Sequence, residues 1–229
     1  MNEIVILDGA RTAIGTFGGM LAGTSPIELA TLVSKAALER SGVEGAQIGQ
    51  VAFGHVINTE LKDMYLSRVA ALQAGVSETT AAMNVNRLCG SGAQAIVSVI
   101  QSLMLRDADF GLAGGAENMS RSPFILQDQR WGAKMGDVRT LDLMLGALNC
   151  PFDTGHMDVT AENVAAEHDV SRAEQDAFAM TSQTRAAAAI RDGRFEDQIT
   201  PVSVKVKRDK VDFICDEHPK QTDEAALAG

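Results

Sequence analysis

The chain has 229 residues, of which 45% are hydrophobic, so it is long enough for one large core or two smaller ones. Its formal net charge of -10 argues against nucleic acid or an anionic membrane surface as a partner, because a polyanion is attracted to neither. The three cysteines stand far apart, and no Cys-x-x-Cys or Cys/His cluster occurs in the sequence. We therefore expect neither a disulfide framework nor a metal site.

The N-terminal residues lack the basic region, apolar stretch and cleavage site of a signal peptide. No apolar run in the sequence approaches the length that spans a membrane. Cysteines that are not expected to form disulfides are typical of a reducing compartment. The sequence therefore predicts a cytoplasmic protein.

Strands and helices alternate along the first half of the chain. The apolar run at 3–7 predicts a buried strand. Ser25 can cap a helix that has Pro26 in its first turn, and Glu28 completes a capping box, so a helix is predicted to run to about Ser41. The remaining elements are strands expected at 50–57, 82–86 and 109–113 and helices expected at 65–74 and 88–106. The last helix is apolar on nearly all sides, which predicts burial. This alternation indicates a mostly parallel sheet covered on both faces.

The texture of the sequence changes after residue 119. Glycine, proline and scattered aromatic residues without periodicity predict long ordered loops at 120–158. Helices are expected at 160–168 and 171–191, followed by a strand pair at 201–207 and 211–215. We expect a core domain at 1–119 and a loop domain at 120–229. The final residues, DEAALAG, are typical of the opening of a helix, so we expect the chain to be a fragment of a longer protein.

Cys89 is the residue that most directly suggests chemistry. It lies between a short apolar run and a long helical pattern, with Gly90 and Gly92 beside it. The N-terminus of a helix presents unpaired N–H groups and partial positive charge, which stabilise an anion. Glycines there permit a sharp turn and leave room for a substrate. A nucleophile fits this pattern, and so does a small buried hydrophobic residue, the common fate of a free cysteine.

The segment NRLCGSGAQAI around Cys89 resembles the acylated-cysteine segment of the thiolases. Further segments resemble thiolase segments in the same order along nearly the whole chain. They are DGARTAIGTFGG at 8–19, AGGAENMSRSP at 113–123, KMGD at 134–137, HMDVTAENVA at 156–165 and SRAEQDAFA at 171–179. The runs at 57–75 and 130–137 are most similar to bacterial β-ketothiolases of polyhydroxyalkanoate and short-chain acyl metabolism.

The resemblance implies an α/β fold of αβαβα layers, here the first half with its inserted loop domain. It implies an acyl-CoA C-acyltransferase, in which CoA cleaves a 3-ketoacyl-CoA or two acyl-CoA molecules condense. Coenzyme A is then a substrate and not a bound cofactor. The resemblance also implies a homodimer or homotetramer.

Five residues take roles from the resemblance. Cys89 matches the nucleophile that carries the acyl group, and its backbone N–H could help to bind the oxyanion. His156 matches a loop-domain residue close to the bound thioester, and Met157 and Leu148 match positions that line the acyl pocket. Lys220 lies where the family often has a basic residue near the CoA nucleotide; a solvated surface lysine is the alternative.

Most of the other polar residues considered are expected to be structural or solvated. His55 is expected to be a satisfied histidine within a strand, and His168 a solvated one. The segment 117–120 is expected to be scaffold at a strand end. A basic hairpin carries Lys205, Lys207, Arg208 and Lys210, and it either steers CoA or is simply solvated.

The sequence departs from the family in three motifs. Thiolases also use a Gly-His-Pro segment, a Cys-x-Gly-Gly-Gly segment and an Asn-Glu-Ala-Phe segment, and none of them occurs in this sequence. The chain alone is therefore expected to be inactive. The alternatives are a catalytically incomplete module that binds CoA or pairs with another subunit, and a decarboxylating condensing enzyme. The opening around Arg11 and the segment at 156–165 argue against the condensing enzyme.

Overall fold

The computed structural model describes residues 3–220 and 222–227, which form two compact units. Unit 1 combines the chain up to Pro123 with Gln198–Cys215, and unit 2 combines Phe124–Asp197 with the segment that begins at Asp216. The first boundary thus lies four residues after the expected one. The strand pair expected in the loop domain belongs to unit 1, because its apolar side chains are buried in a core of that unit.

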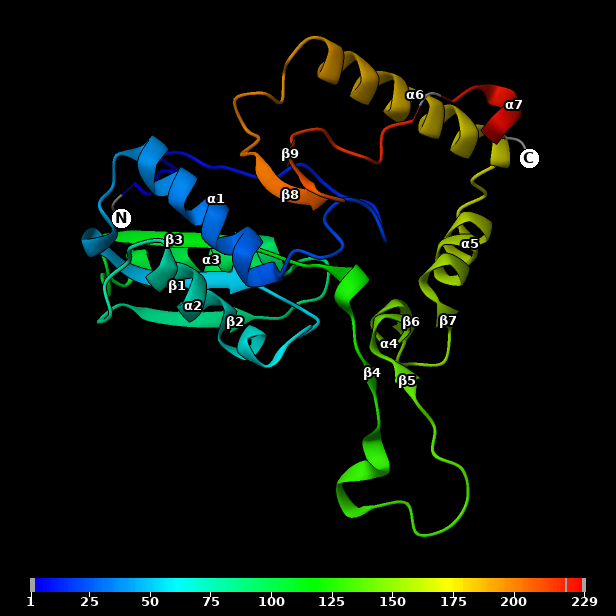
Figure 1. Ribbon diagram of the computed structural model, residues 1–229. Helices are drawn as coiled ribbons and strands as arrows, with labels where there is room; N and C mark the ends of the chain where they lie inside the picture. Colours follow the sequence, from blue (N-terminus) through cyan, green and yellow to red (C-terminus); the bar gives the residue numbers. More distant parts are fainter. Residues whose placement is uncertain (1–2, 221, 228–229) are drawn as a thin grey trace. The chain divides into compact units, whose positions relative to one another are not determined.

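A three-stranded parallel sheet forms the centre of unit 1. Its strands are β1 (Ile48–Gly54), β2 (Ala81–Val85) and β3 (Phe110–Gly115), in the order β2-β1-β3. Helices α1 (Pro26–Ser41) and α2 (Leu66–Gln73) pack on one face of the sheet, and α3 (Ser91–Met104) packs on the other (Figure 1). The expected parallel sheet with helices on both faces is confirmed.

The side chains of β1 show why this sheet is covered on both faces. Val51 and Phe53 belong to the core formed with α1 and α2, whereas Ala52 packs with Ala95 and Val99 of α3. Successive side chains of a strand point to opposite faces, so a central strand buried on both sides must be apolar throughout.

Helix α1 follows its sequence signals closely. The Ser25 hydroxyl accepts a hydrogen bond from the Glu28 N–H, and the Glu28 carboxylate accepts one from the Ser25 N–H. The helix ends at Ser41, and Gly42 follows as its C-cap residue with a φ of 68°. Short 3-10 helices, η1 (Gly45–Gln47) and η2 (Leu61–Tyr65), precede β1 and α2.

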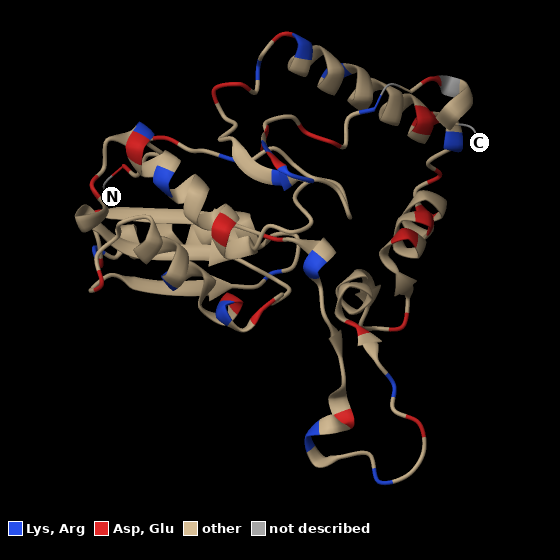
Figure 2. Ribbon diagram, in the orientation of Figure 1, with Lys and Arg blue, Asp and Glu red and all other residues tan. Residues whose placement is uncertain are grey.

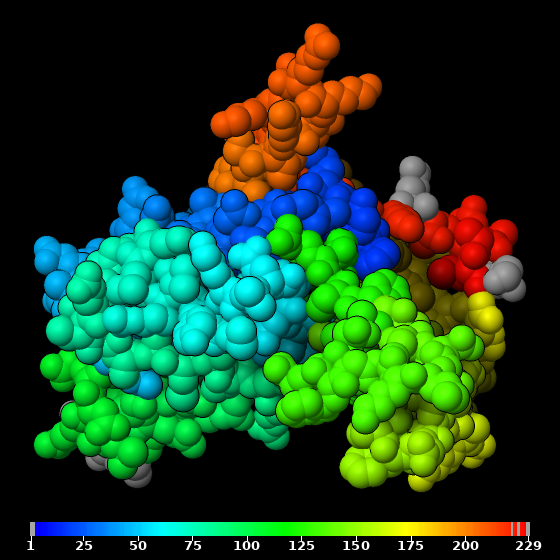
Figure 3. Space-filling view, turned by 60° about the horizontal axis from the view of Figure 1, so that its bottom comes forward, coloured from blue at the N-terminus to red at the C-terminus, as the bar shows by residue number. Residues whose placement is uncertain are grey.

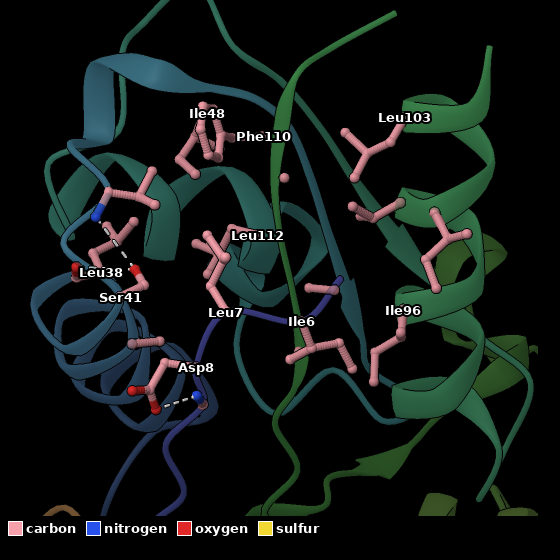
Figure 4. Close-up of a pocket in the computed structure, with 18 of the residues that line it drawn as sticks. Ile6, Leu7, Asp8, Leu38, Ser41, Ile48, Ile96, Leu103, Phe110 and Leu112 are labelled. Carbon is pink, nitrogen blue, oxygen red and sulfur yellow. Dashed lines mark hydrogen bonds between the residues drawn. The ribbon is translucent and has the colours of Figure 1, made fainter. Parts of the chain in front are cut away.

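The predicted strand at 3–7 is wrong. Glu3–Leu7 is extended, but its main chain forms no hydrogen bond within the described part of the chain, and Ile6 is 77% exposed. A strand needs a neighbour about 4.8 Å away. A groove of about 800 Å³ instead separates this segment from the edge of β3 (Figure 4).

Helix α3 is also shorter and less buried than expected. It begins at Ser91, because residues 87–90 form a turn, and it ends at Met104. Only Ser91, Ala95 and Val99 are buried, while Ile96 and Met104 are exposed. Helix α3 therefore has apolar residues on all sides, but not all of its sides are buried within unit 1.

A hairpin of β8 (Val202–Val206) and β9 (Asp209–Phe213) completes unit 1 and confirms the expected strand pair. Its buried side chains, Val202, Val204 and Phe213, pack with Leu21 and Leu29. Its tip projects from the surface of the unit (Figure 3), and basic residues are drawn blue on this hairpin in Figure 2. Four basic residues lie on this hairpin: Lys205, Lys207, Arg208 and Lys210.

Unit 2 consists of helices and very short strand pairs; the 3-10 helix η3 (Met119–Arg121) lies just before it, in unit 1. The elements of unit 2 are β4 (Phe124–Ile125), η4 (Gln127–Trp131), β5 (Leu141–Asp142), α4 (Leu143–Leu148), β6 (Asn149–Cys150), β7 (Gly155–His156), α5 (Met157–Glu167), α6 (Arg172–Arg191) and α7 (Glu224–Leu227). Pairing is antiparallel between β4 and β5 and between β6 and β7.

The helices of unit 2 agree with the sequence in position. Helix α6 has the expected capping box of Ser171 and Glu174. Helix α5 begins three residues earlier than expected, because His156 caps it. The helix expected from the final residues is present as α7, and 228–229 lie outside the described residues. No helix in the described part of the chain is both long and apolar enough to span a membrane.

Candidate active site

Cys89 lies in the turn that joins β2 to α3, and it is exposed. Leu88, directly before it, has a φ of 46°, in the left-handed region that disfavours a residue with a branched side chain. Gly90 follows as the N-cap residue of α3. The turn therefore presents the thiol in front of a helix N-terminus, where unpaired N–H groups and the helix dipole favour negative charge.

Side-chain hydrogen bonds hold the main chain directly before Cys89. The Ser91 hydroxyl accepts a hydrogen bond from the Arg87 N–H (2.8 Å) and donates one to the Leu88 carbonyl (2.5 Å). The Asn86 side-chain carbonyl accepts a hydrogen bond from the Leu88 N–H (3.0 Å). These three contacts fix the unfavourable conformation of Leu88 and hence the position of the thiol.

Close packing beneath the turn requires a glycine in β1. A Cβ added to Gly54 would lie 2.4 Å from the carbonyl carbon of Ser91. By contrast, a Cβ on Gly92 would meet no atom within 4 Å, and one on Gly90 would lie 3.4 Å from the Arg87 carbonyl oxygen. The space in front of the half-buried Gly92 is therefore open, as it would be near an approaching substrate, while Gly54 lets β1 support the helix N-terminus.

A buried histidine lies at the end of β1. The Nδ1 of His55 is 2.8 Å from the Ala116 carbonyl oxygen, so it donates to that oxygen. Its Nε2 has no hydrogen-bond partner among the described residues, although the Asp63 carboxylate lies 3.8 Å away. The expectation of a fully satisfied histidine is wrong, because only one ring nitrogen has a partner.

Glu117 and Asn118 follow β3, and their side chains form hydrogen bonds with the main chain of two other segments of unit 1. The Glu117 carboxylate accepts hydrogen bonds from the N–H groups of Val56 (2.8 Å) and Ile57 (3.2 Å). The Asn118 amide donates to the carbonyls of Leu21 (2.9 Å) and Thr24 (2.7 Å). Both side chains bind main-chain groups of neighbouring segments, as expected of scaffold residues.

Our sequence reasoning missed three residues of this site: Gly54, Asn86 and Ser91. Asn86 contacts the Val56 carbonyl oxygen at 3.5 Å in addition to the Leu88 N–H. An asparagine three residues before the cysteine and a serine two residues after it were visible as turn-forming residues. Nothing in the sequence indicated that Gly54, 35 positions earlier, packs against the same turn.

Three expected substrate-binding residues come together in unit 2. Leu148 ends α4, and β6 follows it directly. In the β6–β7 pair, Asn149 lies opposite His156, and Met157 begins α5. The imidazole Nδ1 of His156 accepts a hydrogen bond from the Asp158 N–H (3.3 Å) and caps α5. Leu148, His156 and Met157 therefore flank one hairpin.

Lys220 lies against a different element of unit 2. Its side chain is exposed, and its backbone N–H donates a hydrogen bond to the Gln183 side chain on α6 (2.9 Å). Cys89 belongs to unit 1, and the other expected site residues belong to unit 2.

Cys150, a cysteine with a perturbed pKa, lies in the same hairpin. Hydrogen bonds from the Thr154 side chain and from the backbone of Phe152 and Thr154 lower the pKa of the Cys150 thiol. None of the three cysteines forms a disulfide. Among the residues that the structure describes, no group of three or more His, Cys, Asp or Glu side chains could hold a metal ion.

The sequence matches the family described as thiolase, N-terminal domain, over residues 4–228. The chain belongs to the thiolase family. Among curated thiolase relatives, the beta-ketothiolase BktB of Cupriavidus necator is 55% identical over 217 residues, which make up 95% of this chain and 55% of that protein. The acetyl-CoA acetyltransferase of Syntrophomonas wolfei is 39% identical over 231 residues, covering 99% of this chain and 58% of that protein.

Solved thiolase structures confirm the expected α/β fold. The crystal structure of the Bacillus anthracis acetyl-CoA acetyltransferase superimposes with a TM-score of 0.93 at 38% identity, covering 98% of this chain and 57% of that one. Human mitochondrial 3-ketoacyl-CoA thiolase gives 0.92 at 35% identity, covering 98% and 59%. The chain thus spans a little over half the length of these thiolases.

Proposed function

We propose that this chain carries the acyl-accepting half of a β-ketothiolase, with Cys89 as the nucleophile. The reaction is reversible thiolysis of a 3-ketoacyl-CoA by CoA, or condensation of acetyl-CoA with a short acyl-CoA. The observation that carries the proposal is the strained turn that presents an exposed thiol at the N-terminus of α3. The names of the relatives, beta-ketothiolase and acetyl-CoA acetyltransferase, support the same chemistry.

In the proposed first step, the Cys89 thiolate attacks the thioester carbonyl of the acyl-CoA. The negative charge moves onto the carbonyl oxygen, where the Cys89 N–H and the positive end of α3 would stabilise it. Collapse of this intermediate breaks the bond to the CoA sulfur, which leaves as a thiolate and takes up a proton. The acyl group remains on Cys89 until a second substrate removes it.

Substrate binding is proposed for His156, Met157, Leu148 and Lys220. The first three flank the β6–β7 hairpin, which supports a shared role in holding the thioester and the acyl group. The exposed ammonium group of Lys220 is suited to a nucleotide phosphate. Coenzyme A is then a substrate, and no further cofactor is part of the proposal.

We further propose that the working protein is a homodimer or homotetramer in the cytoplasm. Three cysteines without a disulfide support a reducing compartment.

The intact mass of the protein before and after incubation with acetyl-CoA tests the proposed chemistry. We expect one acetyl group per chain, located at Cys89 by peptide mapping, in a protein that includes the second half of a thiolase. Cys89→Ala should abolish the addition, and Cys150→Ala, the matched control, should retain it. Acetylation that persists in Cys89→Ala would overturn the assignment. A chain that never gains an acetyl group would favour the alternative role in CoA binding or subunit pairing.

A further inference from the structure

An imidazole ring and two carboxylates meet at the end of β1. His55, directly after β1, is 4% exposed, and Asp63, in η2, is 0% exposed. The carboxylate of Glu117, after β3, is partly buried beside the same ring. None of these three side chains takes part in the proposed acyl transfer, although buried ionisable groups are costly unless their charges are compensated.

The two ring nitrogens of His55 face different carboxylates. Nδ1 is 3.7 Å from Glu117 Oε1, and Nε2 is 3.8 Å from Asp63 Oδ2. Nδ1 carries a proton, because it donates a hydrogen bond to the Ala116 carbonyl oxygen at 2.8 Å. The charge of the ring therefore depends on whether Nε2 carries a second proton.

Two buried polar atoms of this group have no hydrogen-bond partner among the described residues. They are His55 Nε2 and Asp63 Oδ1. In a neutral ring, the lone pair of Nε2 would face the carboxylate, so two acceptors would lie opposite each other away from solvent. A proton on Nε2 removes this conflict, because a positive ring then faces a negative carboxylate.

The hydrogen bonds of Asp63 indicate which of the two groups carries the proton. Its Oδ2 accepts hydrogen bonds from the Thr59 N–H (2.6 Å), the Thr59 hydroxyl (2.8 Å) and the Glu60 N–H (3.1 Å). Three donors stabilise an ionised carboxylate. Glu117 accepts two main-chain hydrogen bonds and is likewise suited to negative charge. The second proton therefore belongs on the ring.

We propose that His55 is an imidazolium ion held between Asp63 and Glu117. It acts as a positioning residue for the turn that presents Cys89. Its positive charge offsets the repulsion between the two carboxylates and so connects η2 to the chain after β3. The effect on acyl transfer rests on the proposed function of Cys89, whereas the charge of the ring does not.

Hydrogen bonds connect the segment of the imidazolium to the turn. The His55 N–H donates to the Val85 carbonyl (3.1 Å), and the Asn86 side chain contacts the Val56 carbonyl oxygen at 3.5 Å. The Asn86 side-chain carbonyl in turn accepts a hydrogen bond from the Leu88 N–H (3.0 Å). Loss of the charge would therefore weaken a series of contacts that ends at the residue directly before the nucleophile.

The contribution of the ring depends on pH in one direction. It is present while both nitrogens carry protons, and it is lost as the pH rises and the second proton leaves. Asp63 faces the ring from η2, and Glu117 faces it from the chain after β3. Arg121, on η3, lies next to this group, because its guanidinium contacts the Thr59 hydroxyl (3.4 Å), which donates to Asp63.

NMR of protein labelled with nitrogen-15 in the imidazole rings tests the proposal. An imidazolium has two protonated nitrogens with similar chemical shifts, whereas a neutral ring has one protonated and one bare nitrogen with widely separated shifts. We expect two protonated nitrogens for His55 at neutral pH. The signals are assigned by their absence from His55→Gln. No substrate is added, so the result does not depend on acyl transfer.

Two variants that each remove one negative charge give a matched comparison. Asp63→Asn removes the carboxylate that faces Nε2, so we expect His55 to become neutral and to keep only the proton on Nδ1. Glu60→Gln removes a carboxylate that pairs with Arg121 at 3.0 Å, so the ring should stay charged. The signals of the unmodified protein decide the charge of the ring even where Asp63→Asn does not fold.

Amide exchange at Leu88 tests whether the charge holds the turn. While the ring is charged, we expect this amide to exchange at least about threefold faster in His55→Gln than in the unmodified protein. The ratio of the two rates should fall towards one as the pH rises and the ring loses its second proton, because only the unmodified protein then changes. A histidine with a purely structural role would give a ratio that does not change with pH.

Three results would overturn the proposal. A neutral ring in the unmodified protein would favour a trapped water molecule between Nε2 and Asp63 Oδ1. A ring that stays charged in a folded Asp63→Asn variant would mean that this carboxylate does not hold the proton. A charged ring with a pH-independent exchange ratio at Leu88 would remove the positioning role. Because no substrate is present, a failure of acyl transfer by Cys89 would affect none of these results.

Discussion

The two units of this thiolase chain differ in what holds their elements in place. Among the described residues, every buried hydrophobic one lies in unit 1, where helices from both sides cover a parallel sheet. In unit 2 none of the described residues is buried, although α6 is a helix of 20 residues. Local signals such as capping boxes are sufficient to specify a helix in either unit. Fixing a turn rigidly also requires packing between residues that are far apart in the sequence.

The two cysteine-containing turns show the same difference. Cys89 follows a left-handed residue that Asn86 and Ser91 hold by hydrogen bonds, above a glycine of the central strand. Cys150 lies in a hairpin of two-residue strands, and hydrogen bonds from the adjacent turn lower the pKa of its thiol. Nonlocal packing on Gly54 therefore adds to local hydrogen bonds in positioning Cys89, whereas local hydrogen bonds tune the Cys150 thiol.

Replacement of Gly54 should have the largest effect, because it removes the nonlocal support of the Cys89 turn. In Gly54→Ala the new Cβ would lie 2.4 Å from a main-chain carbon of Ser91, which a side-chain rotation cannot relieve. We expect the free energy of unfolding to fall by about 3 kcal/mol in urea denaturation. Gly92→Ala is the control, because its Cβ meets nothing within 4 Å, and it should cause no loss. Equal losses in the two variants would contradict the role of close packing.

Replacement of Ser91 should have the next largest effect. Ser91→Ala removes the hydroxyl that bonds Arg87 and Leu88 and leaves their main-chain groups without that partner. We expect a loss of about 2 kcal/mol in unfolding free energy and, if the proposed role of Cys89 holds, slower acylation of Cys89 in a protein that includes the second half of a thiolase. Ser102→Ala on the same helix removes one long hydrogen bond of 3.4 Å and should change the stability by less than about 0.5 kcal/mol. A similar loss in both variants would mean that the Ser91 hydroxyl has no special role.

The two capping boxes should respond differently to the same substitution. Ser25→Ala should lower the unfolding free energy of unit 1 by about 1 kcal/mol, because α1 packs in the core. Ser171→Ala should leave that transition unchanged and accelerate amide exchange only in the first turn of α6. A drop in the unfolding transition of unit 1 caused by Ser171→Ala would show that the helices of the two units are coupled.

The same substitution changes a titration in unit 2. The side chain of Ser171 and its backbone N–H lower the pKa of the Glu174 carboxyl by hydrogen bonding. A lowered pKa stabilises the folded helix above the ordinary glutamate range, and this contribution is lost as the pH falls through the lowered value. In Ser171→Ala, the pKa of Glu174 measured by NMR should rise towards its ordinary value. A pKa that does not move would exclude the serine hydroxyl as the main cause.

The smallest effect is expected at Cys150. Thr154→Val should raise the pKa of the Cys150 thiol, because the side-chain hydrogen bond of Thr154 is the largest cause of its lowering. The rate of alkylation at Cys150, followed by peptide mass, should therefore reach half its maximum at a higher pH in the variant. Alkylation of Cys89 in the same samples serves as the internal control and should be unchanged. An unshifted profile at Cys150 would mean that the backbone contacts alone account for the lowered pKa.

Local signals in the sequence predicted most of the elements correctly. The capping boxes at Ser25 and Ser171 and the strand pair near residues 202–213 were predicted because their determinants lie within a few residues of each other. The strand at Glu3–Leu7 was not, because a strand also needs a neighbour, and an apolar run does not reveal whether one is present. The exposure of one side of α3 was not predicted for the same reason. Apolar residues on all sides of a helix predict burial, but they do not show which part of the molecule covers each side.

The candidate site was predictable to a similar degree. Cys89 could be singled out because its glycines and the following helix are adjacent to it. The support from Gly54 depends on a contact between β1 and α3, which only the folded sheet creates. The grouping of Leu148 with His156 likewise depends on the β6–β7 pairing.

The left-handed conformation of Leu88 has a consequence for anyone who engineers this chain. A leucine at a φ of 46° costs on the order of 1–2 kcal/mol relative to glycine, so Leu88→Gly would rank as a gain in a screen for heat resistance. The same change would increase the conformational freedom of the main chain next to Cys89, so the thiol would no longer be held in one position. Selection for thermostability and selection for turnover would therefore favour opposite residues at this position, and a library screened for melting temperature alone would discard the working geometry.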